Sequence, residues 1–96
     1  MAAISPFQSI EKEALNGLQF PDAEVLKDPA SIVERDHELK RALVLGNTER
    51  SKSKIYFEDD KGFHMVETTV WGVTDKRIIL KQGNVIPIQR VHKVSV

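Results

Sequence analysis

The sequence predicts an α+β fold in which one or two N-terminal helices pack on a curved antiparallel β meander or a small open barrel of four to six strands. Two observations predict this class. Before residue 39, apolar residues recur at helical spacing after prolines that suit the first turn of a helix. After residue 39, short runs rich in Val, Ile and Thr alternate with tight turns. With 96 residues, the chain fits a single domain, mainly helical over residues 1–38 and β meander over residues 39–96.

The first helix is expected over residues 6–16. Ser5 and Pro6 suit an N-cap and a first helical position, and Gly17 suits the residue that follows a helix. Phe20-Pro21 then interrupts the chain, because the residue before a proline avoids the α region. The apolar residues at helical spacing are Phe7, Ile10, Ala14 and Leu18.

A second helix is expected to start at Asp28 and Pro29, which form another N-cap and first-turn pair. It continues through the charged stretch of residues 34–41. Residues 42–45 form a short aliphatic run before Gly46-Asn47, which we interpret as a strand entering a turn. Continuation of the helix is the alternative.

The meander follows from four strand-like runs joined by loops of at most five residues, which are too short for parallel crossovers. In the first turn, Gly62 is expected to supply a positive φ. Pro87 cannot donate to a ladder, so it places the last of these strands at an edge or marks a bend. The runs are residues 55–57, 63–73, 77–81 and 85–88, and Val91, Val94 and Val96 suit a further short strand.

Period-two alternation predicts which side chains are buried. The expected core residues are Ile55, Phe57, Ile78, Leu80, Ile86 and Ile88. Residues 67–72 do not alternate cleanly, which indicates a bulge or sharp bend near Gly72. Trp71 is expected to pack in the core, with an exposed recognition role as the alternative.

The composition excludes several classes of function. The 14 basic and 14 acidic residues give a net charge of zero, so no overall field attracts nucleic acid or a membrane. The absence of cysteine excludes disulfides, thiolate zinc sites and cysteine nucleophiles. No signal-like or membrane-spanning segment is evident, so we expect a cytoplasmic protein without a membrane partner.

No motif for catalysis or cofactor binding is present. The sequence lacks GxSxG, phosphate-loop and HExxH patterns, and His37, His64 and His92 fall in different expected elements. We therefore expect no catalytic residue, metal or cofactor, and a non-enzymatic protein.

Three functions remain open. We favour a small binding or regulatory module that contacts a protein partner or a second copy of itself, through an edge near Pro87 or the face that carries Tyr56. The alternative is RNA binding by a basic and aromatic sheet face. The third is a ligand pocket or active site around Trp71 and His64. The candidate contact residues are Arg50, Lys52, Lys54, Tyr56, Arg77 and Lys81.

Part of the chain resembles known families. The residues at 73–80, followed by Gly83, Ile86-Pro87-Ile88 and Val91, resemble bacterial PH-like and GRAM-like domains. The same ending after an N-terminal helix is similar to small Sm-like or SH3-like barrels, including the Rho-binding antiterminator family. This second resemblance implies a regulatory binding domain without a cofactor that contacts protein or RNA. The whole chain is also similar to short bacterial proteins.

Overall fold

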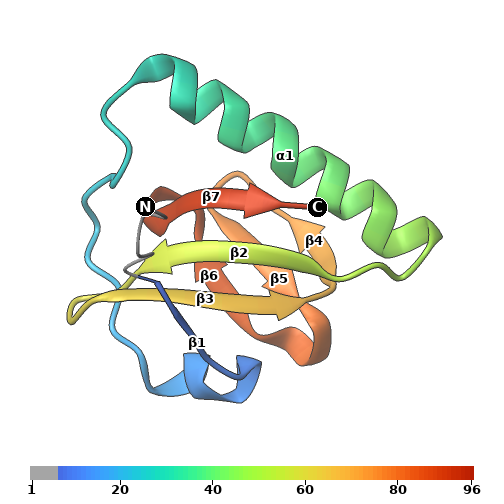
Figure 1. Cartoon of the computed structure of the whole chain (residues 1–96), viewed down its shortest axis with the longest axis horizontal. Helices are drawn as coiled ribbons and strands as arrows, with labels where there is room; N and C mark the ends of the chain where they lie inside the picture. Colours follow the sequence, from blue (N-terminus) through green and yellow to red (C-terminus); the bar gives the residue numbers. More distant parts are fainter. Residues whose placement is uncertain (1–6) are drawn as a thin grey trace, which may run out of the picture.

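The computed structural model describes residues 7–96, and these form two small β-sheets with one long helix, α1 (Pro29–Thr48), lying along one side (Figure 1). The predicted α+β class is confirmed, although the helix is not at the N-terminus. The core lies between the sheets and the helix. Its buried residues are Leu15, Leu39, Ala42, Ile55, Phe57, Val66, Val70, Ile78, Leu80, Ile86, Val91 and Val94.

The first sheet has four strands in the order β1-β3-β2-β7, and the second has three in the order β4-β5-β6. The hairpins are antiparallel as predicted, whereas β1 pairs with β3 in parallel. The expected final strand is present as β7 and pairs with β2. The bounds are β1 Gln8–Ser9, β2 Ser53–Glu58, β3 Phe63–Thr68, β4 Val70–Val73, β5 Arg77–Leu80, β6 Val85–Pro87 and β7 Val91–Ser95.

The expected long strand over residues 63–73 divides at Thr69, where the chain passes from one sheet to the other. The register of β4 against β5 then shifts between Val70 and Gly72, which confirms the predicted irregularity. Within residues 7–96 the strands do not close into a barrel. Instead α1 contacts β4 and β7, which are edge strands of the two sheets, and so covers the open side between them.

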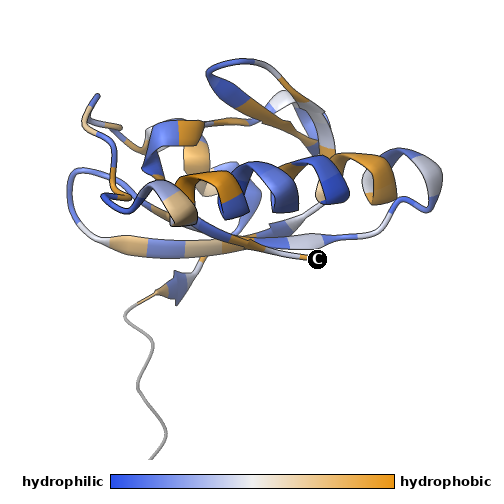
Figure 2. Cartoon of the chain, turned by 90° about the horizontal axis from the view of Figure 1, so that it is seen from above, coloured by the Kyte–Doolittle hydropathy of each residue, from blue (hydrophilic) through white to orange (hydrophobic). Residues whose placement is uncertain are grey.

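Helix α1 begins as predicted, with the Asp28 side chain accepting a hydrogen bond of 3.1 Å from the Ala30 N–H. The strand expected over residues 42–45 is wrong, because the helix continues to Thr48. Ala42 is fully buried while Val44 is 58% exposed, so the aliphatic run spans two faces of a helix. In the view from above, hydrophilic and hydrophobic residues alternate along α1 (Figure 2).

The helix expected over residues 6–16 is also wrong over its described part. The structure instead has β1 and a short 3-10 helix, Lys12–Gly17, of which Leu15 is buried. Here the parallel pairing of β1 with β3 stabilises a strand in place of the helix that the local sequence favours. The Ile10 N–H extends this pairing by donating to the Met65 carbonyl at 2.9 Å. The proposed cap at Ser5 and Pro6 lies outside the described residues.

Residues 18–28, here called the strap, run in an extended path along the molecule to α1 (Figure 1). Backbone hydrogen bonds join the strap to distant segments: Val25 N–H donates to the Gln89 carbonyl at 2.9 Å, and Asp60 N–H to the Gln19 carbonyl at 3.0 Å. None of the helices in residues 7–96 combines the length and apolar character needed to cross a bilayer.

The predicted alternation is confirmed for five of the six core positions. The exception, Ile88, is half-buried and begins a short 3-10 turn, Ile88–Arg90, after β6. Pro87 lies on the edge strand β6, as expected. The positive φ expected at Gly62 is wrong: the Asp59 carboxylate organises this turn by accepting hydrogen bonds from the Lys61 and Gly62 N–H groups at 2.9 and 2.8 Å.

Candidate functional site

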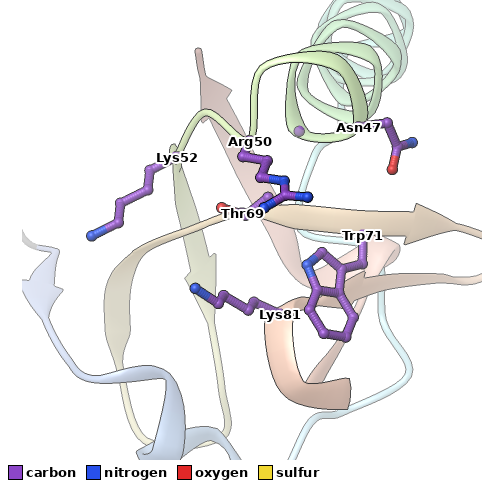
Figure 3. A pocket seen from close by; sticks show the side chains of 7 residues that line it. Asn47, Arg50, Lys52, Thr69, Trp71 and Lys81 are labelled. Atoms are coloured by element: carbon purple, nitrogen blue, oxygen red, sulfur yellow. The ribbon is translucent and has the colours of Figure 1, made fainter.

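The candidate site is a hollow of about 610 Å³ at the end of the molecule where α1 stops (Figure 3). Four segments meet there: the last turn of α1, the loop into β2, the strands around the sheet crossing, and the end of β5. We call it the Trp71 hollow. Its lining residues are Gly46, Asn47, Arg50, Lys52, Thr69, Trp71 and Lys81.

A close contact between α1 and β4 sets the position of the helix end. Gly46 is buried inside the helix, and a Cβ atom there would overlap the Val70 carbonyl oxygen. Only glycine allows the helix backbone to approach this strand so closely. The contact places Asn47 and the chain that follows it beside Trp71 on β4.

The chain leaves α1 through a left-handed residue. Arg50 has φ 55°, a conformation that costs a residue with a side chain about 1 kcal/mol. The Ser51 N–H reaches back to the Leu45 carbonyl at 3.3 Å, so the turn is tight. It carries the Arg50 side chain over the hollow and starts β2 directly after Lys52.

The expectation that Trp71 packs in the core is wrong, because its side chain is 52% exposed. The register shift in β4 occurs at this residue, and a bulge of this kind redirects a side chain. Lys81 is held close by, since its N–H donates to the Thr69 carbonyl at 3.0 Å. Figure 3 shows the Lys81 side chain beside the indole ring and Arg50 on the side of Thr69.

The hollow concentrates positive charge. In the part of the chain that the structure describes, Arg50, Lys52 and Lys81 have no carboxylate within ion-pair distance. All three side chains are exposed, so their charges are available to a ligand.

Two other arginines are buried and engaged in internal contacts. Arg35 donates two hydrogen bonds to the Glu24 carboxylate, at 2.6 and 2.7 Å, and one to the Val91 carbonyl at 2.9 Å. The Arg35 guanidinium lowers the pKa of Glu24 below its usual value. Arg90 donates to the carbonyls of Ala23 at 2.8 Å and Glu58 at 3.0 Å. These two arginines join the strap to the rest of the molecule.

The structure brings together half of the predicted contact residues. Arg50, Lys52 and Lys81 line the hollow, whereas Arg77 lies at the opposite end of β5, about 13 Å of strand away from Lys81. The single basic and aromatic sheet face is therefore wrong, because β2 and β5 belong to different sheets. Lys54 and Tyr56 lie on β2, outside the hollow.

Sequence reasoning missed Asn47 and Thr69 as site residues and placed Trp71 in the core. The broken alternation of residues 67–72 was the available signal, because a bulge that redirects the chain also redirects a side chain. The sequence carries no such signal for Asn47, because its position in the site depends on the helix continuing past residue 45.

Tyr56 belongs to an aromatic cluster on the four-stranded sheet. Its ring lies 5.2 Å from Phe7, centroid to centroid, and Phe7 lies 5.3 Å from Phe63 and 5.5 Å from His92. We call these four residues the aromatic cluster. It is separate from the Trp71 hollow, with which it shares no lining residue.

His64, which was expected beside Trp71, does not line the Trp71 hollow. His64 lies at the other end of β3 from the sheet crossing, with its Nε2 atom 3.1 Å from Asp59 Oδ1 and its ring 5.6 Å from that of Phe57. Burial raises the pKa of Asp59, but the two backbone donors of its turn and His64 outweigh this, so the pKa lies below its usual value. Residues 7–96 contain no cluster of three or more side chains suited to a metal ion.

Comparison of the chain with family models, curated proteins and solved structures finds no match. The resemblance to PH-like and Sm-like domains therefore stays a prediction.

Proposed function

We propose that this protein is a non-enzymatic binding module that holds single-stranded nucleic acid in the Trp71 hollow. The observation that carries this proposal is the arrangement of three cations, none with an ion-pair partner within residues 7–96, around an exposed tryptophan. Proteins that bind single strands use this combination, since cations follow the phosphates and aromatic rings stack on bases.

Each part of the hollow has a role in this proposal. Lys52 and Lys81 neutralise phosphates, and the planar guanidinium of Arg50 pairs with phosphate or stacks on a base. The free indole of Trp71 stacks on a base, which contributes about 1 to 3 kcal/mol in comparable sites. The Asn47 amide and the Thr69 hydroxyl supply hydrogen bonds.

The lining supports binding rather than catalysis. The described residues around the hollow carry three cations, an amide, a hydroxyl and an indole, but no carboxylate or imidazole that could act as a general base near pH 7. We therefore propose that a ligand bound in the hollow is released without chemical change.

An acidic segment of a protein partner could use the same cations, so a protein ligand is the competing outcome. Two features favour nucleic acid. The indole offers a flat face next to the charges, and the side chains around it are polar, whereas protein contact sites have an apolar centre that excludes water.

The test uses Trp71, the only tryptophan, as its own fluorescent probe. We expect an RNA or DNA octanucleotide to quench its emission at low salt, with affinity falling as salt rises. Lys52→Ala and Lys81→Ala should each weaken binding by about tenfold and reduce the logarithmic salt slope by about 0.7. The matched control is Arg77→Ala, an exposed cation of β5 outside the hollow, which should bind like the wild type.

Two outcomes would reject the proposal. The first is no quenching by either octanucleotide at low salt. The second is equal quenching by a hexaglutamate peptide with the same sensitivity to both lysine variants, which would identify the hollow as a site for an acidic protein segment.

A further inference from the structure

We infer that the bound strand leaves the Trp71 hollow along the outer face of β2, over Lys54 to Tyr56, so that the ligand is a polymer rather than a single nucleotide. This inference rests on the proposed function. The hollow alone defines neither the direction in which a bound strand continues nor the number of nucleotides that contact the protein.

The outer face of β2 continues from the hollow as a row of side chains. Lys52 and Lys54 are exposed and Tyr56 is half-buried, whereas Ser53 and Ile55 between them are buried. Residues two apart on a strand share a face and are spaced by about 6.6 Å. These three side chains therefore form a row that begins at the hollow.

The charges on the two sides of this row differ in sign. In the described part of the chain Lys54 has no carboxylate within ion-pair distance. Its neighbours across the ladders are Glu67 on β3 and Ser95 on β7, and the β7 neighbour of Tyr56 is Lys93. A phosphate chain is repelled on the β3 side and attracted on the β7 side. The path therefore lies along the boundary of β2 and β7.

The row ends at Tyr56. Tyr56 is half-buried in the aromatic cluster, in which Phe63 is 37% exposed, and a second base would stack on this exposed aromatic surface. Beyond it lies the Glu58 carboxylate, 2.9 Å from His92 Nε2 and 3.7 Å from an Arg90 guanidinium nitrogen. Arg90, the cation beside this carboxylate, is buried, and β2 carries no further exposed cation for a phosphate. From the hollow to Tyr56 the path is long enough for about three to four nucleotides.

The experiment measures Trp71 quenching by oligouridylates of increasing length, from the mononucleotide to the octanucleotide, at one low salt concentration. We expect affinity to rise at least about tenfold between the dinucleotide and the tetranucleotide and to change little beyond the hexanucleotide.

Two variants test the path. Lys54→Ala and Tyr56→Leu should each weaken hexanucleotide binding by about five- to tenfold and leave dinucleotide binding unchanged. Lys61→Ala, which removes an exposed cation in the turn at the far end of β2, is the matched control and should have no effect on either ligand. Because Lys54 is exposed, its variant tests the path even if Tyr56→Leu lowers stability.

The outcomes separate the two proposals. Equal affinity for the dinucleotide and the hexanucleotide, or a hexanucleotide affinity unchanged in Lys54→Ala, overturns the path while the hollow remains a nucleotide site. No quenching at any length overturns both.

Discussion

The molecule has two groups of basic side chains, one near each end of α1, and the two groups differ in what surrounds them. Near its N-terminal end, Arg35 and Arg90 are each only 6% exposed and donate to carbonyl and carboxylate oxygens of the strap, β2 and β7. Beyond its C-terminal end, Arg50 and Lys81 are exposed and have no ion pair among the described residues.

The difference shows how the same kind of side chain takes different roles. A buried guanidinium is tolerated only when its donors are paired, so Arg35 and Arg90 stabilise the fold and are not available to a ligand. An exposed cation without a partner contributes little to folding but keeps its charge for a ligand. Loss of a basic side chain at the first end should therefore lower stability, whereas loss of one at the second should weaken binding.

The largest expected effect is at Arg90. Arg90→Ala removes the donors to the Ala23 and Glu58 carbonyls and should lower the free energy of unfolding by about 3 kcal/mol. Urea denaturation followed by circular dichroism measures it. Arg41→Ala, which removes an exposed arginine paired with Glu38, is the control and should change stability by less than about 0.5 kcal/mol. A similar loss of unfolding free energy in both variants would contradict the claim that the buried arginines stabilise the fold and the exposed ones do not.

The next effect is at the contact between α1 and β4. Gly46→Ala should destabilise the protein by about 2 kcal/mol, because the overlap with the Val70 carbonyl exceeds the gain in helix propensity. It should also weaken oligonucleotide binding, since the helix end lines the hollow. Gly17→Ala is the matched control: an added Cβ there meets nothing within 4 Å, and no destabilisation is expected. A Gly46→Ala protein of unchanged stability would show that the close approach is not required.

A smaller effect of opposite sign is expected at Arg50. Arg50→Gly relieves the positive φ and should stabilise the fold by about 1 kcal/mol, while weakening oligonucleotide binding by about tenfold. Thermal unfolding and Trp71 fluorescence measure the two changes. Gln82→Gly also relieves a positive φ, of 68°, but Gln82 does not line the hollow, so it should stabilise without affecting binding. Binding that is equally lost in both variants would break the link between Arg50 and the ligand.

The smallest effect is on the pH dependence of stability. The pKa values of Glu24 and Asp59 are lowered in the folded protein, so both carboxylates bind protons less readily there than in the unfolded chain. Their contribution to stability is fully present above their usual pKa values, and it is lost as the pH falls below about 4 through the lowered ones. Glu24→Gln should flatten this acid loss, as measured by urea denaturation across pH. An unchanged acid profile would contradict the assignment to Glu24.

The sequence predicted the elements whose signals are local. Asp28-Pro29 marked the start of α1, and the alternation around Ile55 and Ile78 identified buried faces, because caps and pleats depend on neighbouring residues. Where distant pairing decides, the prediction failed. The segment at Gln8–Ser9 joins β3 as a strand, and the run at residues 42–45 stays helical because its buried side packs inward beside Leu39.

The candidate site was predictable only in part, for the same reason. Arg50 and Lys52 form a visible cationic loop in the sequence, and Lys81 was a candidate on a strand. Their meeting at Trp71 depends on the sheet crossing at Thr69 and on the contact of Gly46 with β4. These are tertiary contacts that no local pattern encodes. Arg77 is basic like the residues of the hollow but lies at the other end of β5. The sequence alone does not exclude it from the site, because these tertiary contacts are not visible there.

The most direct test of the account is amide and indole chemical-shift mapping on the isotopically labelled protein during addition of a single-stranded octanucleotide. We predict shifts at the Trp71 indole N–H and at the backbone amides of Arg50, Lys52 and Lys81, which disappear as salt is raised. Shifts confined to the strap and the surroundings of Arg90, or no shifts at low salt, would contradict the claim that the cations beyond the C-terminal end of α1 form the binding site.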